Sequence, residues 1–327
     1  MNINQADILE GNIPKDILDV LLYDHTTQRN IFWATKDYEL WGEGYAEMDE
    51  ITYEKIADNN KIIPRVLKDR AQQSARSRDM AEVFTPSWVC NAQNNLIDNA
   101  WFGRKGVFNT EVNENGVHTW IPTTTPIEFP KGKTWKDYVR DNRMEITCGE
   151  APYITSRYDT TTGELISIEK RIGLLDRKLR VINENVHNSG EWLSAAQDAY
   201  KSIYGFEWQG DNLLLAREAM LCTFIENYKL KFDKRPLDIS VKCIASIISW
   251  NIWQMDGLKG VIPNSCTETI ESSLFGDEIR KPCKGCTDGG YYNHTGNYCL
   301  IKDWRTKDPK TKKMGKKIRF IDLFKQV

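Results

Sequence analysis

The chain has 327 residues, of which 40% are hydrophobic and 28% charged, a composition that supports a buried core and excludes collagen-like and low-complexity proteins. The formal charge of −2 excludes an overall cationic coat for nucleic acid, although local basic patches remain compatible with it. The polar, acidic start shows no export signal, and the longest apolar stretch, 244–253, is too short to span a membrane. We therefore expect a cytoplasmic protein that has no membrane partner.

Residues 1–80 predict a mostly helical N-terminal region. Apolar residues recur at helical spacing at Ile8, Ile13, Ile17, Val20 and Leu21. The stretch 65–79 consists of good helix formers and holds five basic and two acidic residues. Such a stretch is either the solvated face of a helix or a contact for the DNA backbone.

Residues 81–262 predict the core of the protein as strands that alternate with helices. Strand-like patterns occupy 144–148, 202–208 and 243–250, and an amphipathic helix is predicted from Asp211 to Lys231. This order is typical of a doubly wound α/β fold with a mainly parallel sheet. Residues 263–327 form a third region, which is rich in cysteine, glycine and lysine.

Three features are expected at the carboxyl ends of the predicted strands, where open α/β sheets bind their ligands. Gly149 ends the first strand and is followed by small residues, so the backbone there can approach a ligand closely. Glu207 ends the second strand, where a carboxylate can accept hydrogen bonds from both hydroxyls of a ribose. Asp256 follows the third strand, where its carboxylate can accept a hydrogen bond from the amino group of an adenine. Each feature alone is more often structural, but their order predicts a nucleoside pocket.

Four runs of the sequence resemble motifs of the N6-adenine DNA methyltransferases of restriction–modification systems. The run 81–89 resembles their E-V-F-T-P motif, and 145–154 resembles their AdoMet loop, D-P-A-C-G-S-G-T-F-L. The run 203–218 resembles I-Y-G-x-E followed by A-R, and 251–258 resembles N-I-x-x-G-D-x-L. The resemblance covers about residues 81–260, in the order of the family.

This resemblance implies a class I AdoMet-dependent methyltransferase fold and methyl transfer to N6 of adenine in DNA. DNA is then a partner, and a second restriction–modification subunit is a further candidate. Glu145 stands where the family has aspartate, and Ala151 where it has a second glycine. The implied cofactor-binding residues are Phe84, Thr85, Pro86, Glu145, Cys148, Gly149, Glu207 and Asp256.

The sequence also departs from the family. Its catalytic Asn-Pro-Pro-Tyr motif, which holds the flipped base, is absent, and the nearest match places Asp322 and Phe324 as catalytic candidates. Only 71 residues follow Asp256, fewer than the roughly 100 that four more strands and their helices require. The 58-residue separation of Gly149 and Glu207 predicts a helical insertion near 159–199. The alternative is therefore a non-catalytic AdoMet-fold DNA-binding or partner subunit, whose catalytic motif is lost or supplied by another chain.

The third region predicts a zinc-knuckle-like site with the spacing C-x2-C-x7-H-x4-C. Its predicted ligands are Cys283, Cys286, His294 and Cys299, and Cys266 is a substitute for His294. Free thiols or a disulfide are the alternatives. The following stretch, 302–319, holds nine basic and two acidic residues with aromatic residues nearby, which suits either nucleic-acid contact or a solubilising tail.

Overall fold

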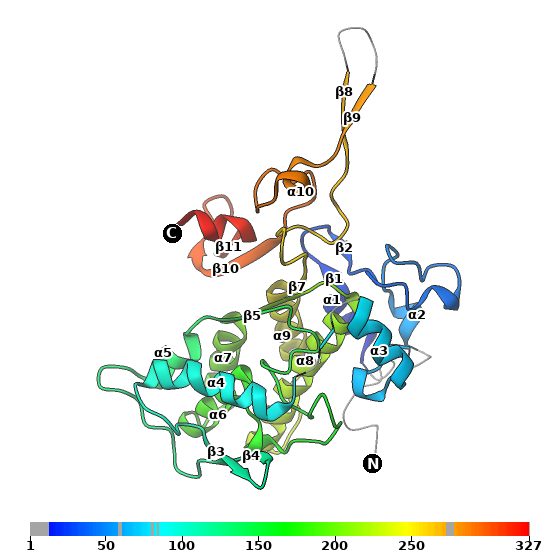
Figure 1. The fold of residues 1–327 in the computed structure, drawn as a ribbon. Helices are drawn as coiled ribbons and strands as arrows, with labels where there is room; N and C mark the ends of the chain where they lie inside the picture. Colours follow the sequence, from blue (N-terminus) through cyan, green and yellow to red (C-terminus); the bar gives the residue numbers. More distant parts are fainter. Residues whose placement is uncertain (1–12, 58–60, 80–81, 84, 273–277, 327) are drawn as a thin grey trace.

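The computed structural model describes residues 13–57, 61–79, 82–83, 85–272 and 278–326 (Figure 1). The α-helices are α1 (Lys15–Leu22), α2 (Tyr53–Ile56), α3 (Arg70–Asp79), α4 (Ser87–Phe102), α5 (Trp135–Arg140), α6 (Leu174–Asn185), α7 (Ser189–Lys201), α8 (Gly210–Phe232), α9 (Asp238–Asn251) and α10 (Lys284–Asp288). The strands are β1 (Tyr23–Asp24), β2 (Arg29–Asn30), β3 (Asn109–Glu114), β4 (Val117–Pro122), β5 (Arg143–Ile146), β6 (Ile203–Glu207), β7 (Ile252–Gln254), β8 (Thr269–Ser272), β9 (Glu278–Lys281), β10 (Leu300–Lys307) and β11 (Met314–Arg319). Short 3-10 helices are η3 (Glu39–Trp41), η4 (Arg65–Leu67), η5 (Ile168–Lys170) and η6 (Phe320–Gln326).

The central sheet consists of three parallel strands in the order β5-β6-β7. Every residue of β6 is buried, since this strand lies between two others and has both faces covered. Within the described residues no further strand joins this sheet. The structure therefore confirms an α/β core with a parallel sheet, whereas the larger doubly wound sheet remains a prediction.

The predicted elements at 144–148, 202–208 and 211–231 are confirmed as β5, β6 and α8. The predicted third strand at 243–250 is wrong, because these residues belong to α9, and the strand is the three-residue β7 that follows it. Ile244, Ile247 and Ile248 are buried at i, i+3 and i+4. A continuous apolar run of this length fits a buried strand and a buried helix equally well.

One hydrophobic cluster extends from Ile13 to Ile252 and joins α1 to the helices of the core. Helix α1 packs mainly on α9, so the beginning of the described chain shares its core with the region around the sheet. The long connection between β5 and β6 holds α6 and α7, which confirms the predicted helical character of this insertion.

The C-terminal region covers one face of β6 and β7. A second hydrophobic cluster includes Phe206 and Trp253 from the sheet and Ile301 and Phe320 from the C-terminal region. The hairpin of β8 and β9 projects away from the body of the protein, while that of β10 and β11 lies beside the cluster (Figure 1). None of the described helices has the length and apolar character needed to cross a membrane.

Candidate functional site

A cavity of about 1040 Å³ opens at the carboxyl ends of β5 and β6. The size is sufficient for a nucleoside cofactor. Among the predicted cofactor-binding residues, those that line the cavity are Thr85, Glu145, Cys148, Gly149 and Glu207. The sheet thus brings together residues that lie up to 122 positions apart in the sequence.

The loop after β5 has an unusual backbone. Thr147, Gly149 and Ala151 have φ values of 53°, 54° and 61°, in the left-handed region. This region is costly for a β-branched residue such as Thr147, and strain of this kind clusters at functional sites. A side chain at Gly149 would meet no atom within 4 Å, so glycine is favoured here by its backbone freedom and not by lack of space. The resulting turn directs the Gly149 N–H toward β6.

Glu207 accepts a hydrogen bond from that N–H group. Its Oε2 accepts a hydrogen bond from Gly149 N at 2.8 Å, and its Oε1 accepts one from Gln209 N at 3.2 Å. Burial raises the pKa of the Glu207 carboxyl to about 7, although these backbone hydrogen bonds oppose the shift. Each carboxylate oxygen still has acceptor capacity for a ligand.

Glu145 is a second buried carboxyl group in the cavity wall. Its Oε2 has no hydrogen-bond partner among the described residues. Burial, and then the charge of Glu207, hold the pKa of Glu145 well above its usual range. An acceptor without a partner in a buried site is costly, and a ligand that donates a hydrogen bond would remove this cost.

The cavity is acidic. Its lining contains the carboxyl groups of Glu47, Asp79, Glu82, Glu145 and Glu207. Its only lining cation, within the described part of the chain, is Arg78, whose Nε lies 2.7 Å from Asp79. The lining therefore supplies oxygen acceptors for a ligand that donates hydrogen bonds, and among the described residues it supplies no unpaired cation for an anionic phosphate.

The charged stretch 65–79 supplies one wall of this cavity. Helix α3 places Arg76 in a buried network, where its guanidinium lies 2.6 Å from Glu82 and 2.8 Å from Asp211. Arg76 therefore acts as an internal anchor between α3 and α8, and it is not available to the DNA backbone.

The other predicted residues lie elsewhere. Phe84 lies outside the described residues, and neither Pro86, which precedes α4, nor Asp256 lines the cavity. Asp256 follows β7, and its carboxylate accepts from Leu258 N at 3.0 Å and pairs with Lys259 at 3.3 Å.

The two catalytic candidates belong to η6, on the C-terminal region. Asp322 pairs with Arg319 at 3.0 Å, and Phe324 stacks on Tyr291 with ring centroids 4.9 Å apart. Neither residue lines the cavity.

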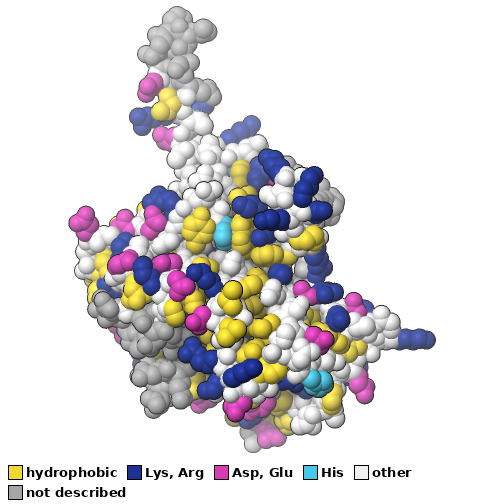
Figure 2. All heavy atoms as spheres, turned by 180° about the vertical axis from the view of Figure 1, so that it is seen from behind, with side chains coloured by type: hydrophobic (Ala, Val, Ile, Leu, Met, Phe, Trp, Pro, Cys, Tyr) yellow, Lys and Arg dark blue, Asp and Glu magenta, His cyan; other side chains and the backbone are white. Residues whose placement is uncertain are grey.

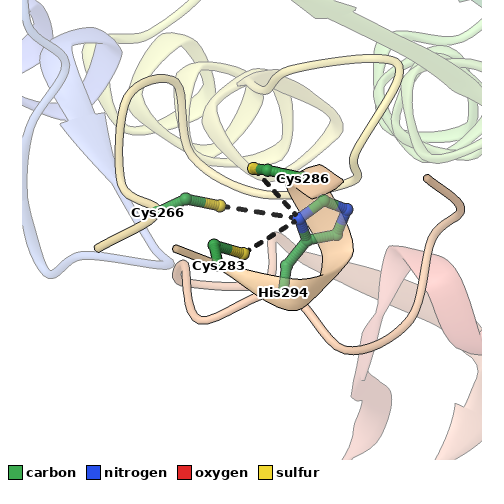
Figure 3. A group of neighbouring side chains, drawn as sticks. All are labelled: Cys266, Cys283, Cys286 and His294. Carbon is green, nitrogen blue, oxygen red and sulfur yellow. Dashed lines mark hydrogen bonds between the residues drawn. The ribbon is translucent and has the colours of Figure 1, made fainter. Parts of the chain in front are cut away.

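A second site lies in the C-terminal region, where Cys266, Cys283, Cys286 and His294 converge (Figure 3). Their ligand atoms lie within 4.8 Å of one another, and His294 Nδ1 is 3.6, 3.6 and 3.7 Å from the three sulfur atoms. Tetrahedral zinc, with Zn–S of about 2.3 Å and Zn–N of about 2.0 Å, requires an N···S separation of about 3.6 Å. The separations of His294 Nδ1 from the three sulfur atoms therefore fit those around a zinc ion.

Groups around this cluster orient the ligands. His294 Nε2 donates to Gly290 O at 2.8 Å, so the lone pair of Nδ1 is directed at the sulfur atoms. Gly285 allows this approach, because a Cβ there would lie 2.6 Å from the imidazole. Burial opposes ionisation of Cys283, but hydrogen bonds from Thr295 outweigh it and lower the pKa of the thiol to about 5.

The structure corrects one predicted metal ligand. Cys299 does not belong to the cluster; it is fully buried in the second hydrophobic cluster, and its Sγ donates to Gln254 O at 3.4 Å. Cys266 takes its place in the cluster, together with His294, for which it is only a substitute in the sequence-based prediction. The spacing C-x2-C identified one half of the site, whereas its fourth member comes from a loop 17 residues upstream.

Sequence reasoning missed several polar residues of the cavity. Glu82 lies within the run 81–89, and Gln209 follows Glu207 by two positions, so both adjoin motifs that were recognised. Asn94 on α4 and Asn212 on α8 also line the cavity, but no local pattern distinguishes them from other helix residues.

Comparisons with known proteins give no independent assignment. No protein-family model, no curated protein and no solved structure matches this chain.

Proposed function

We propose that this chain is an AdoMet-binding protein of the N6-adenine DNA methyltransferase type, with its cofactor in the acidic cavity. The observation that carries the proposal is the hydrogen bond from Gly149 N–H to Glu207, which joins a glycine loop to a strand-end carboxyl group beside that cavity. The resemblance of 145–154 and 203–207 to the AdoMet loop and ribose-binding strand supports the same assignment.

The residues of the cavity have complementary tasks in this proposal. Glu207 accepts the ribose hydroxyls through the acceptor capacity that Gly149 and Gln209 leave free. Glu145 Oε2, which has no partner among the described residues, accepts a hydrogen bond from a donor group of the cofactor. The lining has no unpaired cation among the described residues, which disfavours the pyrophosphate of a nicotinamide cofactor. When bound, AdoMet supplies an electrophilic methyl group.

Calorimetric titration of the full chain with AdoMet tests the cofactor site. Glu207→Gln should weaken binding at least tenfold, since a hydrogen bond to a charged group contributes about 1.5–3 kcal/mol. Asp256→Asn is the control, because this residue lies outside the cavity lining. Equal affinities of the wild type and the Glu207 variant would falsify the proposed pocket, and equal losses in both variants would place the cofactor elsewhere.

A second function is favoured by the position of η6. The catalytic candidates Asp322 and Phe324 are engaged with Arg319 and Tyr291 and do not line the cavity, and the described sheet has three strands. In this second proposal the chain binds AdoMet and DNA as a partner subunit, and another polypeptide supplies the catalytic motif. Transfer of a tritiated methyl group to mixed-sequence DNA by the isolated chain would rule out this proposal.

We also propose that the cluster of Cys266, Cys283, Cys286 and His294 holds one structural zinc ion. The four side chains supply all four ligands of a tetrahedral zinc ion, so no coordination position stays open for a water molecule or a substrate. Elemental analysis should find one zinc per chain. Absence of zinc from protein expressed in zinc-supplemented medium would contradict this assignment.

A further inference from the structure

The hairpin of β10 and β11 carries a group of cations on two tryptophan rings. The lysine–indole cluster consists of Lys201, Lys302, Lys317, Trp250 and Trp304. Lys302 Nζ lies 4.2 Å from the ring centroid of Trp304 and 5.2 Å from that of Trp250. Lys317 Nζ lies 5.1 Å from Trp250, and Lys201 Nζ lies 5.6 Å from Trp304.

The fold brings this cluster together from four elements. Lys302 and Trp304 share one face of β10 because side chains alternate along a strand, and Lys317 is the cross-strand partner of Lys302 on β11. Lys201 ends α7, and Trp250 belongs to α9. The indole N–H of Trp304 donates to Asn251 Oδ1 at 2.7 Å, which fixes the ring under the lysines.

The positive charge of the cluster is not neutralised by described carboxylates. None of its three lysines forms an ion pair within the described chain, and the neighbouring charges that act on Lys302 are Lys317 and Lys201. Burial and these two cations lower the pKa of Lys302. His25 stacks on Trp250 at 3.7 Å, and burial with nearby cations lowers its pKa to about 3, so it adds no charge at neutral pH.

The two acids of the stretch 302–319 are engaged elsewhere. Asp303 Oδ1 accepts hydrogen bonds from the backbone N–H groups two and three positions further on, and Asp308 Oδ1 does the same. Figure 2 shows basic side chains gathered over this hairpin. Positive charges gathered in this way repel one another unless a polyanion or small anions lie beside them.

We propose that the lysine–indole cluster binds the phosphate backbone of duplex DNA. Its charge is concentrated on side chains that lie over the tryptophan rings, and the same hairpin carries the other basic residues of the stretch 302–319. The choice of DNA as the polyanion rests on the proposed function, whereas the phosphate chemistry rests on the cluster itself. No base-specific contact is part of this proposal, so binding should depend on salt more than on sequence.

Fluorescence anisotropy of a labelled mixed-sequence duplex, titrated with the full chain in 50–200 mM KCl, tests the proposal. In Lys302→Gln/Lys317→Gln, the slope of log K against log salt should fall in magnitude by about 1.8, since each lost phosphate contact removes about 0.9. Lys302→Arg/Lys317→Arg should keep the wild-type slope.

Lys234→Gln/Arg235→Gln is the matched control, because it removes the same charge from two exposed residues that follow α8. An unchanged slope in the Lys302/Lys317 glutamine variant would overturn the proposal, and so would an equal decrease in the control. Competition by polyglutamate as strong as that by unlabelled duplex would exclude phosphate recognition. The titrations contain no AdoMet, so failure of the cofactor site leaves this result interpretable.

Discussion

Replacement of Glu207 by glutamine should stabilise the folded protein at alkaline pH while it weakens cofactor binding. The amide oxygen of glutamine can still accept the Gly149 N–H, so the substitution keeps the shape of the site and removes its charge. The hydrogen bond from Gln209 N is lost at every pH, and a comparison of two pH values cancels its cost. If Glu207 had only a structural role, its replacement would not both stabilise the folded protein and weaken cofactor binding.

The size of the effect follows from the pKa of Glu207. Burial raises that pKa from 4.5 to about 7, so between these values the folded state binds more protons than the unfolded state. Stability therefore falls as the pH rises through this window. A shift of about 2.5 units corresponds to about 3 kcal/mol at pH 8, but to only about 1 kcal/mol at pH 5. Glutamine avoids this penalty, so its gain should be about 2 kcal/mol larger at pH 8.

Urea unfolding at pH 5 and pH 8, followed by tryptophan fluorescence, measures this difference. Glu43→Gln provides the control, because Glu43 is exposed and its loss should change stability equally at both pH values. The reasoning is wrong if Glu207→Gln alters the free energy of unfolding by the same amount at pH 5 and pH 8. A larger gain at pH 5 would reverse the sign of the argument.

Three further predictions concern the metal cluster and the buried network. Cys266→Ser should abolish zinc binding, whereas Cys299→Ser should retain one zinc per chain in elemental analysis. Gly285→Ala should weaken zinc affinity in a chelator competition, because its Cβ would meet the imidazole at 2.6 Å. Arg76→Met should lower the free energy of unfolding in urea by about 3–5 kcal/mol, since Asp211 would lose a buried partner; a loss below 1 kcal/mol would contradict this.

The sequence predicted the elements that local pattern encodes. Strands β5 and β6 end in a glycine turn and in a carboxylate, and helix α8 shows an apolar stripe at helical spacing. These signals are local, so the sequence alone assigns Gly149 and Glu207 to the ends of two strands. Since the carboxyl ends of parallel strands meet at one edge of a sheet, the two residues are then expected to lie close together.

The sequence could not separate α9 from a strand. Val241, Ile244, Ile247 and Ile248 satisfy both a buried helix and a fully buried strand, and only packing against α1, α7 and α8 selects the helix. As a result the sequence places this strand too early. Asp256 does follow the strand that pairs with β6, but its carboxylate pairs with Lys259 and does not line the cavity.

Only the tertiary structure shows which residues far apart in the sequence lie close together. A metal ion requires ligand atoms within a few ångströms, and the path of the chain brings Cys266 to this position while it buries Cys299 under the sheet. In the same way, Trp250 meets Lys302 because α9 lies against β10. Residue types and their spacing fixed the chemistry available to this protein; packing between distant segments decided which of those residues act together.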